Sequence, residues 1–217
     1  MIPLLHDFTG QTVLVVGGGA VGARKARRFA READVIVVSP EFADRDFGGA
    51  TRIRAAPDPD EIDGWLERTA PALVVAATDD EAINEALESA AQARGCLVNR
   101  ADRSGGRDPG SVVVPATVRD DPVVVAVATG GTAPTLSAYL RDEIEETVSG
   151  AGEMAMCLAE LRADLKSQNV SPARRRKLLA AVTGSPELWT ALRKGTPKAC
   201  QVIEDVLGEE DSGGDST

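Results

Sequence analysis

The chain has 217 residues, of which 43% are hydrophobic, and it carries a formal net charge of −10 at pH 7. This length predicts a main domain with a smaller second part. The acidic balance disfavours a nucleic-acid partner, because no basic surface is available to neutralise phosphates. No apolar run approaches the roughly 18 residues that span a bilayer, and the first residues lack the pattern of a secretory signal. We therefore expect no membrane partner and a cytoplasmic location.

Cysteine, histidine and lysine are all scarce. Cys96, Cys157 and Cys200 form no CxxC pair, and His6 is the only histidine, so we expect free thiols and no metal site. Lysine supplies few of the 24 basic residues. An acidic, lysine-poor surface is typical of proteins from salt-loving organisms, where ionic strength screens the repulsion between carboxylates. We therefore expect a halophilic protein whose stability depends on salt.

The first hundred residues alternate short apolar runs with amphipathic stretches, which is typical of βαβ units and a parallel sheet. Strands are predicted at residues 12–16, 35–38, 73–77 and 97–98. Helices are predicted after the first and third of these strands, and a loop region at residues 51–59. The fold class is therefore α/β, with a Rossmann-like parallel sheet.

The pattern changes in the second half of the chain. Segments 112–118 and 123–128 flank a turn-rich tetrapeptide at residues 119–122, which predicts a β-hairpin. From Thr135 onward a C-terminal helical region is expected, with helix starts at Ser171, Ser185 and Thr196, each followed by proline. Two apolar stripes mark its helices: Leu136, Tyr139, Leu140 and Ile144, and then Met154, Cys157, Leu158, Leu161 and Leu165, with Met154 and Met156 expected in the core.

A glycine-rich motif joins the first strand to the first helix. The run Gly17-Gly18-Gly19-Ala20-Val21-Gly22 fits GxGxxG. The first glycine permits a tight turn, the second lets the backbone approach a pyrophosphate, and the third lets helix and strand pack closely. Phosphates would meet the free N–H groups at the helix N-terminus. The order of strand, glycines, helix and strand favours a dinucleotide site at Gly17, Gly19, Ala20, Val21 and Gly22 over a mere tight turn.

The choice between NAD and NADP depends on the end of the second strand, where the motif expects an acidic residue about 20 residues on. Glu41 is the nearest candidate, although Ser39-Pro40 occupies the usual place. Ser39 and Glu41 are therefore predicted cofactor contacts. Arg45 and Arg52 would suit the extra phosphate of NADP, so NAD is favoured and NADP stays open.

Residues 15–26, from Val15 to Ala26 with the glycine motif inside, resemble the N-terminal signature of the precorrin-2 dehydrogenase and sirohydrochlorin ferrochelatase family, the front half of many siroheme synthases. Residues 75–80 with Asn84, and residues 98–102, 114–116, 128–134 and 140–145, are similar to further family motifs in the same order. The resemblance implies oxidation of precorrin-2 to sirohydrochlorin with NAD, in some members Fe²⁺ insertion, and a homodimer to which the hairpin and the next helix contribute.

The resemblance also implies site residues. Through the Asn99-x-x-Asp102 spacing, the family's catalytic aspartate corresponds to Asp102. Asp102 follows an apolar strand, so it should lie at the carboxyl edge of the sheet, where its carboxylate could act as a general base; the alternative is that it caps a loop. The resemblance places Thr78 at the cofactor, and it places Asn99, Arg100, Thr129, Gly130 and Gly131 at the substrate, although Gly130-Gly131 also suits a simple turn.

Several arginines lie near Asp102 in the sequence. Precorrin-2 is a polycarboxylate, and arginine binds carboxylates through paired hydrogen bonds. These arginines could therefore bind the substrate, or they could be solvated loop charges; they are Arg100, Arg103, Arg107 and Arg119. Segment 103–111 departs from the family pattern, because it is longer and richer in glycine than the usual hydrophobic stretch.

The predicted organisation is an NAD-binding Rossmann domain at residues 1–111, a dimerisation and active-site segment at 112–148, a helical domain at 149–207 and a disordered acidic tail at 208–217. The function that this predicts is a precorrin-2 dehydrogenase. Two alternatives remain. A regulatory NAD-sensing module would need the glycine loop but not the Asn99 and Thr129 motifs. A chelatase without dehydrogenase activity would be marked by a degenerate glycine loop.

Overall fold

The computed structural model describes residues 2–103, 111–195 and 203. The chain forms two compact units, the first running through Val114 and including Gly130–Thr132, the second starting at Pro115. This division differs from the predicted one, because segment 112–148 does not stand apart: its hairpin and helix share the second unit with the later helices. The predicted helix start at Thr196 and the predicted tail at 208–217 fall outside the described residues.

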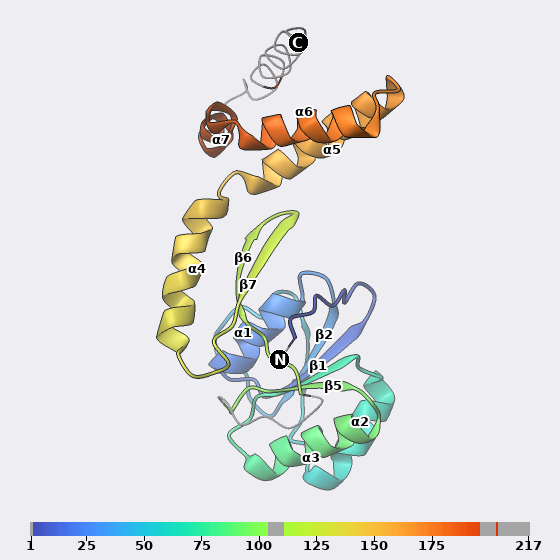
Figure 1. The fold of residues 1–217 in the computed structure, drawn as a ribbon. Coiled ribbons are helices and arrows are strands. Elements are labelled where there is room, and N and C mark those ends of the chain that lie inside the picture. The colour runs from blue at the N-terminus through green and yellow to red at the C-terminus, as the bar shows by residue number, and fades with distance from the viewer. Residues whose placement is uncertain (1, 104–110, 196–202, 204–217) are drawn as a thin grey trace, which may run out of the picture. The chain divides into compact units, whose positions relative to one another are not determined.

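The first unit is built on a parallel sheet with the strand order β3-β2-β1-β4-β5 (Figure 1). Its strands are β1 (Thr12–Val16), β2 (Asp34–Ser39), β3 (Thr51–Arg54), β4 (Leu73–Ala76) and β5 (Leu97–Arg100). Its helices are α1 (Ala20–Phe29), α2 (Ile62–Thr69), which follows the 3₁₀ turn η1 (Pro59–Glu61), and α3 (Glu81–Ala93). The predicted Rossmann-like α/β sheet is confirmed.

Helices cover both faces of this sheet (Figure 1). Alternate strand residues point to opposite faces. On one face, Val13 and Val15 pack with Ala26 and Phe29 of α1. The other face packs against α2 and α3, through Leu14, Val16, Ile62, Leu66, Leu87 and Ala91. Burial on both faces explains why the strands appear in the sequence as nearly continuous apolar runs.

The prediction of a loop at residues 51–59 was wrong in its first part. Thr51–Arg54 forms β3, which pairs in parallel with β2 in the register Ile36↔Thr51 and Ser39↔Arg54. Within β3 only Ile53 is apolar, and it is half-buried. Because β3 lies at the edge of the sheet, it buries little surface, so no apolar run announces it.

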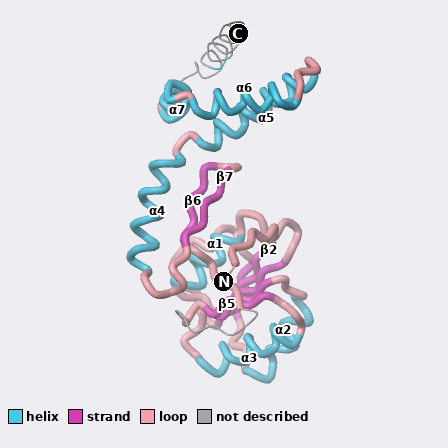
Figure 2. Tube along the Cα trace, viewed as in Figure 1, coloured by secondary structure: helices cyan, strands magenta, loops and turns pink. Residues whose placement is uncertain are grey.

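The predicted hairpin is present in the second unit, but its first strand begins later than predicted (Figure 2). β6 (Ala116–Asp120) pairs with β7 (Val123–Val127), and the pairing Asp120↔Val123 leaves only Asp121 and Pro122 in the turn. Val112 belongs instead to the first unit, where its N–H donates to the Val98 carbonyl at 2.8 Å. The apolar run from 112 to 118 therefore divides: Val112 bonds to β5 in the first unit, and the residues from Ala116 onward pair with β7 in the second.

The rest of the second unit is helical, with α4 (Pro134–Val148), α5 (Ala151–Ser167), α6 (Pro172–Gly184) and α7 (Pro186–Arg193). The predicted helix starts at Ser171 and Ser185 are confirmed, because their hydroxyls accept from the N–H groups of Arg174 and Leu188. None of the described helices combines the length and apolar composition needed to cross a bilayer.

Only one of the two predicted apolar stripes is covered within the described residues. Met154 is buried with the α6 and α7 residues Val182, Leu188 and Leu192. Met156 is 54% exposed, so its predicted place in the core was wrong: two residues along a helix turn a side chain to nearly the opposite side. No residue of α4 is buried, and Tyr139 is 59% exposed.

The start of α5 lies against the hairpin tip, and Gly152 makes this approach possible. A Cβ at Gly152 would lie 2.4 Å from the Asp121 carbonyl oxygen, and its N–H donates to Asp120 Oδ2 at 3.1 Å. We predict that Gly152→Ala lowers the free energy of unfolding by about 1–3 kcal/mol through overpacking. Gly184→Ala is the control, because nothing lies within 4 Å of its Cβ position. Denaturant unfolding followed by helical circular dichroism measures both, and equal stabilities would contradict the prediction.

Candidate cofactor and active site

In the glycine loop between β1 and α1, two glycines lie so close to backbone carbonyl oxygens that no side chain would fit at their positions. Gly17 has φ +119°, and a Cβ there would lie 2.2 Å from the Ala77 carbonyl oxygen at the end of β4. A Cβ at Gly22 would lie 1.9 Å from the Gly17 carbonyl oxygen. The predicted roles of the first and third glycines, a tight turn and close helix–strand packing, are confirmed.

Gly19 is different, because its Cβ position has nothing within 4 Å. Gly19 caps α1 without a side-chain hydrogen bond, the first turn holds no acidic residue, and Ala20 and Val21 are exposed. The N–H groups of the first turn are therefore open to a ligand and unopposed by negative charge. This end of α1 fits the pyrophosphate of a dinucleotide.

The predicted cofactor residues Ser39, Glu41 and Thr78 all lie beside the glycine loop. A Cβ at Gly18 would meet the Glu41 carbonyl oxygen at 2.2 Å and Ser39 Oγ at 2.8 Å, and the Ala43 N–H donates to the Gly18 carbonyl at 2.8 Å. On the β4 side, the Thr78 nitrogen would lie 3.1 Å from a Cβ at Gly17. The residues that follow β1, β2 and β4 therefore lie together at the carboxyl ends of the strands.

Thr78 is held by a network within the β4–α3 loop. Its hydroxyl donates to Asn84 Oδ1 at 2.8 Å, and Asn84 Nδ2 returns a bond to the Thr78 carbonyl at 2.9 Å. Asn84 is buried, and Asp80 caps α3 by accepting from the N–H groups of Ala82 and Ile83. These hydrogen bonds hold the loop in one conformation next to the glycines.

Asn99 lies at the end of β5 on the α1 face, with both ends of its amide in use. Its Oδ1 accepts from Lys25 Nζ at 2.9 Å, and its Nδ2 donates to the Val112 carbonyl at 2.7 Å. Asn99 is 1% exposed. In this structure it therefore ties α1 and segment 111–114 to the sheet. The predicted contact of Asn99 with the substrate stays a prediction.

Arg100, the next residue, points to the α3 face and binds Asp102 with two hydrogen bonds. Its Nε donates to Asp102 Oδ1 at 2.9 Å, and its Nη2 donates to Oδ2 at 2.7 Å. These bonds hold the pKa of the Asp102 carboxyl below its ordinary value, against the opposing effect of partial burial. The Asp102 side chain remains 20% exposed. Asp102 is therefore an ionised carboxylate, held in place just beyond the carboxyl end of β5.

Among the described arginines of the predicted cluster, Arg100 and Arg103 bind carboxylates of the protein itself. The Arg100 side chain is 1% exposed and also binds Glu88 at 2.8 Å and Glu81 at 3.0 Å. In this structure it holds carboxylates of the protein itself, and its predicted contact with the substrate stays a prediction. Arg103 binds Glu81 and lies 3.8 Å from Glu88. Arg119 belongs to the second unit, and Arg107 falls outside the described residues.

Sequence reasoning missed three residues that contact Asn99 or Arg100: Lys25, Glu81 and Glu88. Glu88 carried a signal: on α3 it shares a face with Asn84, Leu87 and Ala91, all of which are buried. A charged residue on a core-facing stripe needs a buried partner of opposite charge. No comparable pattern marked Lys25, whose partner Asn99 is 74 residues away.

Thr129 and the two following glycines form a turn that leads to α4. Gly130 and Gly131 have φ values of +65° and +83°, which favour glycine. Thr129 Oγ1 donates to the Ala133 carbonyl at 3.1 Å and lies 2.8 Å from Ser137 Oγ. The geometry accounts for the glycines as a turn, and the predicted role of this segment at the substrate remains a proposal.

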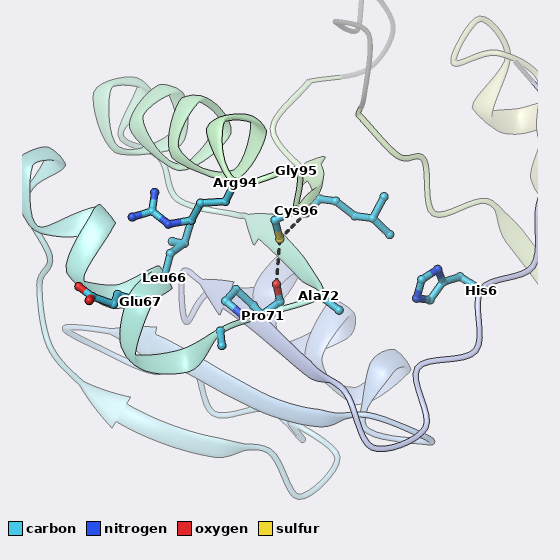
Figure 3. A pocket seen from close by; sticks show the side chains of 10 residues that line it. His6, Leu66, Glu67, Pro71, Ala72, Arg94, Gly95 and Cys96 are labelled. Atoms are coloured by element: carbon cyan, nitrogen blue, oxygen red, sulfur yellow. Dashed lines mark hydrogen bonds between the residues drawn. The ribbon is translucent and has the colours of Figure 1, made fainter.

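A cavity of about 670 Å³ lies at the opposite end of the strands, on the side where β4 and β5 begin (Figure 3). It is lined by residues that precede β4 and β5, among them Pro71, Ala72, Gly95 and Cys96, and by His6. Cys96 Sγ donates to the Pro71 carbonyl at 3.0 Å. Ligands of open parallel sheets bind outside the carboxyl ends of the strands, so this cavity is separate from the candidate site.

Comparison with known proteins agrees with this geometry. A family model described as "Putative NAD(P)-binding" matches residues 4–116. The chain is 30% identical to the precorrin-2 dehydrogenase of Methanosarcina barkeri over 210 residues, covering 92% of this chain and 90% of that protein. It is 35% identical to the siroheme synthase of Pseudomonas fluorescens over 193 residues, covering 85% of this chain but only 39% of that protein.

The fold has a solved counterpart. The structure of SirC, a precorrin-2 dehydrogenase, matches with a TM-score of 0.68 at 22% identity, covering 96% of this chain and 100% of that one. The open glycine loop and the matched family model both indicate a nicotinamide cofactor. Because the relative from Methanosarcina barkeri is similar along nearly its whole length, the chain belongs to the precorrin-2 dehydrogenase family.

Proposed function

We propose that this protein oxidises precorrin-2 to sirohydrochlorin in siroheme biosynthesis, with NAD as the hydride acceptor. One observation carries the proposal: in a chain of this family, an ionised carboxylate, Asp102, follows β5 at the same sheet edge as the open glycine loop after β1. Two strand spacings, about 10 Å, separate β1 from β5. The nicotinamide half of a dinucleotide can span that distance from the pyrophosphate.

The reaction removes one hydrogen as a hydride and a second as a proton. When bound, NAD supplies the acceptor for the hydride. The Asp102 carboxylate accepts the proton as a general base. Arg100 occupies one lone pair on each carboxylate oxygen, which leaves further lone pairs for the substrate. Gly19, Ala20 and Val21 hold the pyrophosphate, and Thr129, Gly130 and Gly131 contribute to the substrate site.

NAD rather than NADP is the proposed cofactor. Exposed Glu41 follows β2, where an acid can bind the ribose hydroxyl groups. Arg52, which could bind the phosphate of NADP, lies instead over the rings of Phe42 and Phe47, each at 5.6 Å. A hollow of about 460 Å³ near Arg52 is lined by Phe42, Ala43, Asp44, Arg52 and Arg54. Because two arginines line it, the test of function compares NAD with NADP.

We also propose a homodimer in which the hairpin and α4 contact the partner. The apolar stripe of α4 supports this, because Leu136 is 48% exposed and Tyr139 is 59% exposed in the single chain. Exposed apolar stripes of this kind mark association surfaces. Sedimentation equilibrium distinguishes the dimer from a monomer.

The test of function is an anaerobic incubation of the purified protein with precorrin-2 in high salt. Samples receive NAD, NADP or neither cofactor, each with and without Fe²⁺. Sirohydrochlorin absorbance that appears with NAD, and faster than with NADP, supports the proposal. NAD binding without any product would favour a sensing module. A parallel sample receives sirohydrochlorin and Fe²⁺ in place of precorrin-2. Siroheme formed in that sample, with no oxidation of precorrin-2 in the others, would favour a chelatase.

The pKa of Asp102 predicts the pH dependence of the oxidation. Because Arg100 lowers this pKa below its ordinary value of 3.8, the carboxylate is lost only when the pH falls below that value. We therefore expect kcat/KM to show no titration of the base between about pH 5 and pH 8. Steady-state rates across this range measure it. An acid limb with a midpoint near neutrality would show that a different group is the base.

The net charge of −10 predicts stability that depends on salt. Repulsion among the excess carboxylates is unscreened in dilute buffer, so the melting temperature should rise as KCl approaches molar concentration. Thermal unfolding followed by circular dichroism measures this. A melting temperature that is the same in dilute buffer and in molar KCl would contradict the proposed adaptation to salt.

A further inference from the structure

Arg100 stands at the centre of a group of carboxylates contributed by two elements. Asp102 follows β5, whereas Glu81 and Glu88 lie on α3, seven residues apart and so on the same face of the helix. Arg100 donates to all three: at 2.7 Å and 2.9 Å to Asp102, at 2.8 Å to Glu88 and at 3.0 Å to Glu81. The network therefore joins the rigid helix α3 to the proposed catalytic carboxylate.

The three carboxylates differ in exposure, which separates their roles. The Glu88 side chain is 10% exposed, Asp102 20% and Glu81 55%, while Arg100 itself is 1% exposed. A buried guanidinium keeps one direction only if its remaining N–H groups are bound. Glu88 binds Nη1 and Glu81 binds Nη2, so these two glutamates fix the plane in which Nε and Nη2 meet Asp102.

A second arginine, Arg103, contacts the same two glutamates of α3. Arg103 binds Glu81 and lies 3.5 Å from Glu85 and 3.8 Å from Glu88. Glu85 is 62% exposed, and its contact within this network is with Arg103. Glu85 is therefore a glutamate on the same helix, about one turn from both Glu81 and Glu88, whose ion pair is with Arg103 and not with Arg100.

We infer that Glu81 and Glu88 are positioning residues for the oxidation: acting through Arg100, they hold the Asp102 carboxylate in the direction from which it takes the substrate proton. This inference rests on the proposed function. A catalytic group that rotates away from its substrate loses rate without losing substrate affinity, and a misplacement of 1 Å costs up to about 100-fold. The expected signature is therefore a lower kcat with little change in KM.

The test uses single substitutions that keep the shape of the side chain. We expect Glu88→Gln to lower kcat about tenfold and Glu81→Gln several-fold, with KM and the NAD dissociation constant within about twofold of the original protein. Glu85→Gln is the matched control and should keep the original kcat. If Glu88→Gln fails to fold, Glu81→Gln carries the test alone, because Glu81 is largely exposed.

A double-mutant cycle separates positioning from a general structural role. Glu88→Gln and Glu81→Gln should cost nothing further in an Asp102→Asn background, because the carboxylate that they orient is already gone. Equal fold losses in both backgrounds, or the same kcat for the Glu81, Glu85 and Glu88 variants, would overturn the inference. An original protein with no oxidation of precorrin-2 would instead overturn the proposed function, so the two failures are distinguishable.

Discussion

Replacing Asp102 by asparagine is expected to slow sirohydrochlorin formation by roughly 10²–10⁴, the usual contribution of a general base. Asparagine keeps the shape of the side chain, but its amide cannot accept the proton. Because asparagine offers one acceptor oxygen, it can keep only one of the two hydrogen bonds that Arg100 donates to Asp102. Binding and turnover should therefore separate, with the NAD dissociation constant unchanged and kcat reduced.

Single-turnover kinetics with excess enzyme measures this effect directly, and calorimetric NAD binding checks the intact cofactor site. Asp121→Asn is a matched control, because Asp121 belongs to the second unit and is exposed. A full rate of oxidation in Asp102→Asn would show that Asp102 serves only to close the loop with Arg100. The base would then have to be sought elsewhere, for example in bound water or in a carboxylate of the substrate.

Replacing Gly19 by aspartate is expected to abolish NAD binding, with a loss on the order of 100-fold or more in affinity, because like charges brought together cost several kcal/mol. The fold should survive, since a Cβ at this position meets nothing within 4 Å. The new carboxylate would stand where the pyrophosphate must approach the first N–H groups of α1.

Isothermal titration calorimetry with NAD provides the measurement, and the thermal transition without NAD checks the fold. Gly184→Asp is the control, because its Cβ position is equally open and it lies in α6, in the second unit. Unchanged NAD affinity in Gly19→Asp would remove the glycine loop as the cofactor site. Loss of affinity in both variants would point to a charge effect of the whole protein.

The sequence predicted the parallel sheet well because its strands are buried on both faces. The runs at β1, β2 and β4 are apolar at nearly every position, and the glycines between β1 and α1 follow the spacing that a close turn requires. β3 was missed because an edge strand needs no such run. The start of β6 was misplaced because residues 112–115 extend the same apolar run while pairing in part with β5.

The site was predictable only where one residue type suits one local geometry. Gly17 and Gly22 could be assigned in advance, because a tight turn and close helix–strand packing each require glycine, and Gly19 followed from the spacing of the motif. The two glutamates that bind Arg100 could not be assigned to it, because they come from a helix 12 to 19 residues earlier in the chain and the pairing depends on how α3 packs. The sequence around Arg100 does not indicate whether its side chain is buried against carboxylates or exposed to solvent.

The ratio of NADH to sirohydrochlorin formed from precorrin-2 under anaerobic conditions tests the central claim most directly. Both products can be followed by absorbance in one sample, with protein omitted from a parallel sample. The proposed reaction predicts one NADH for each sirohydrochlorin, and no product in the sample without protein. Sirohydrochlorin that appears without an equal amount of NADH, or precorrin-2 that stays unchanged while NAD is bound, would contradict it.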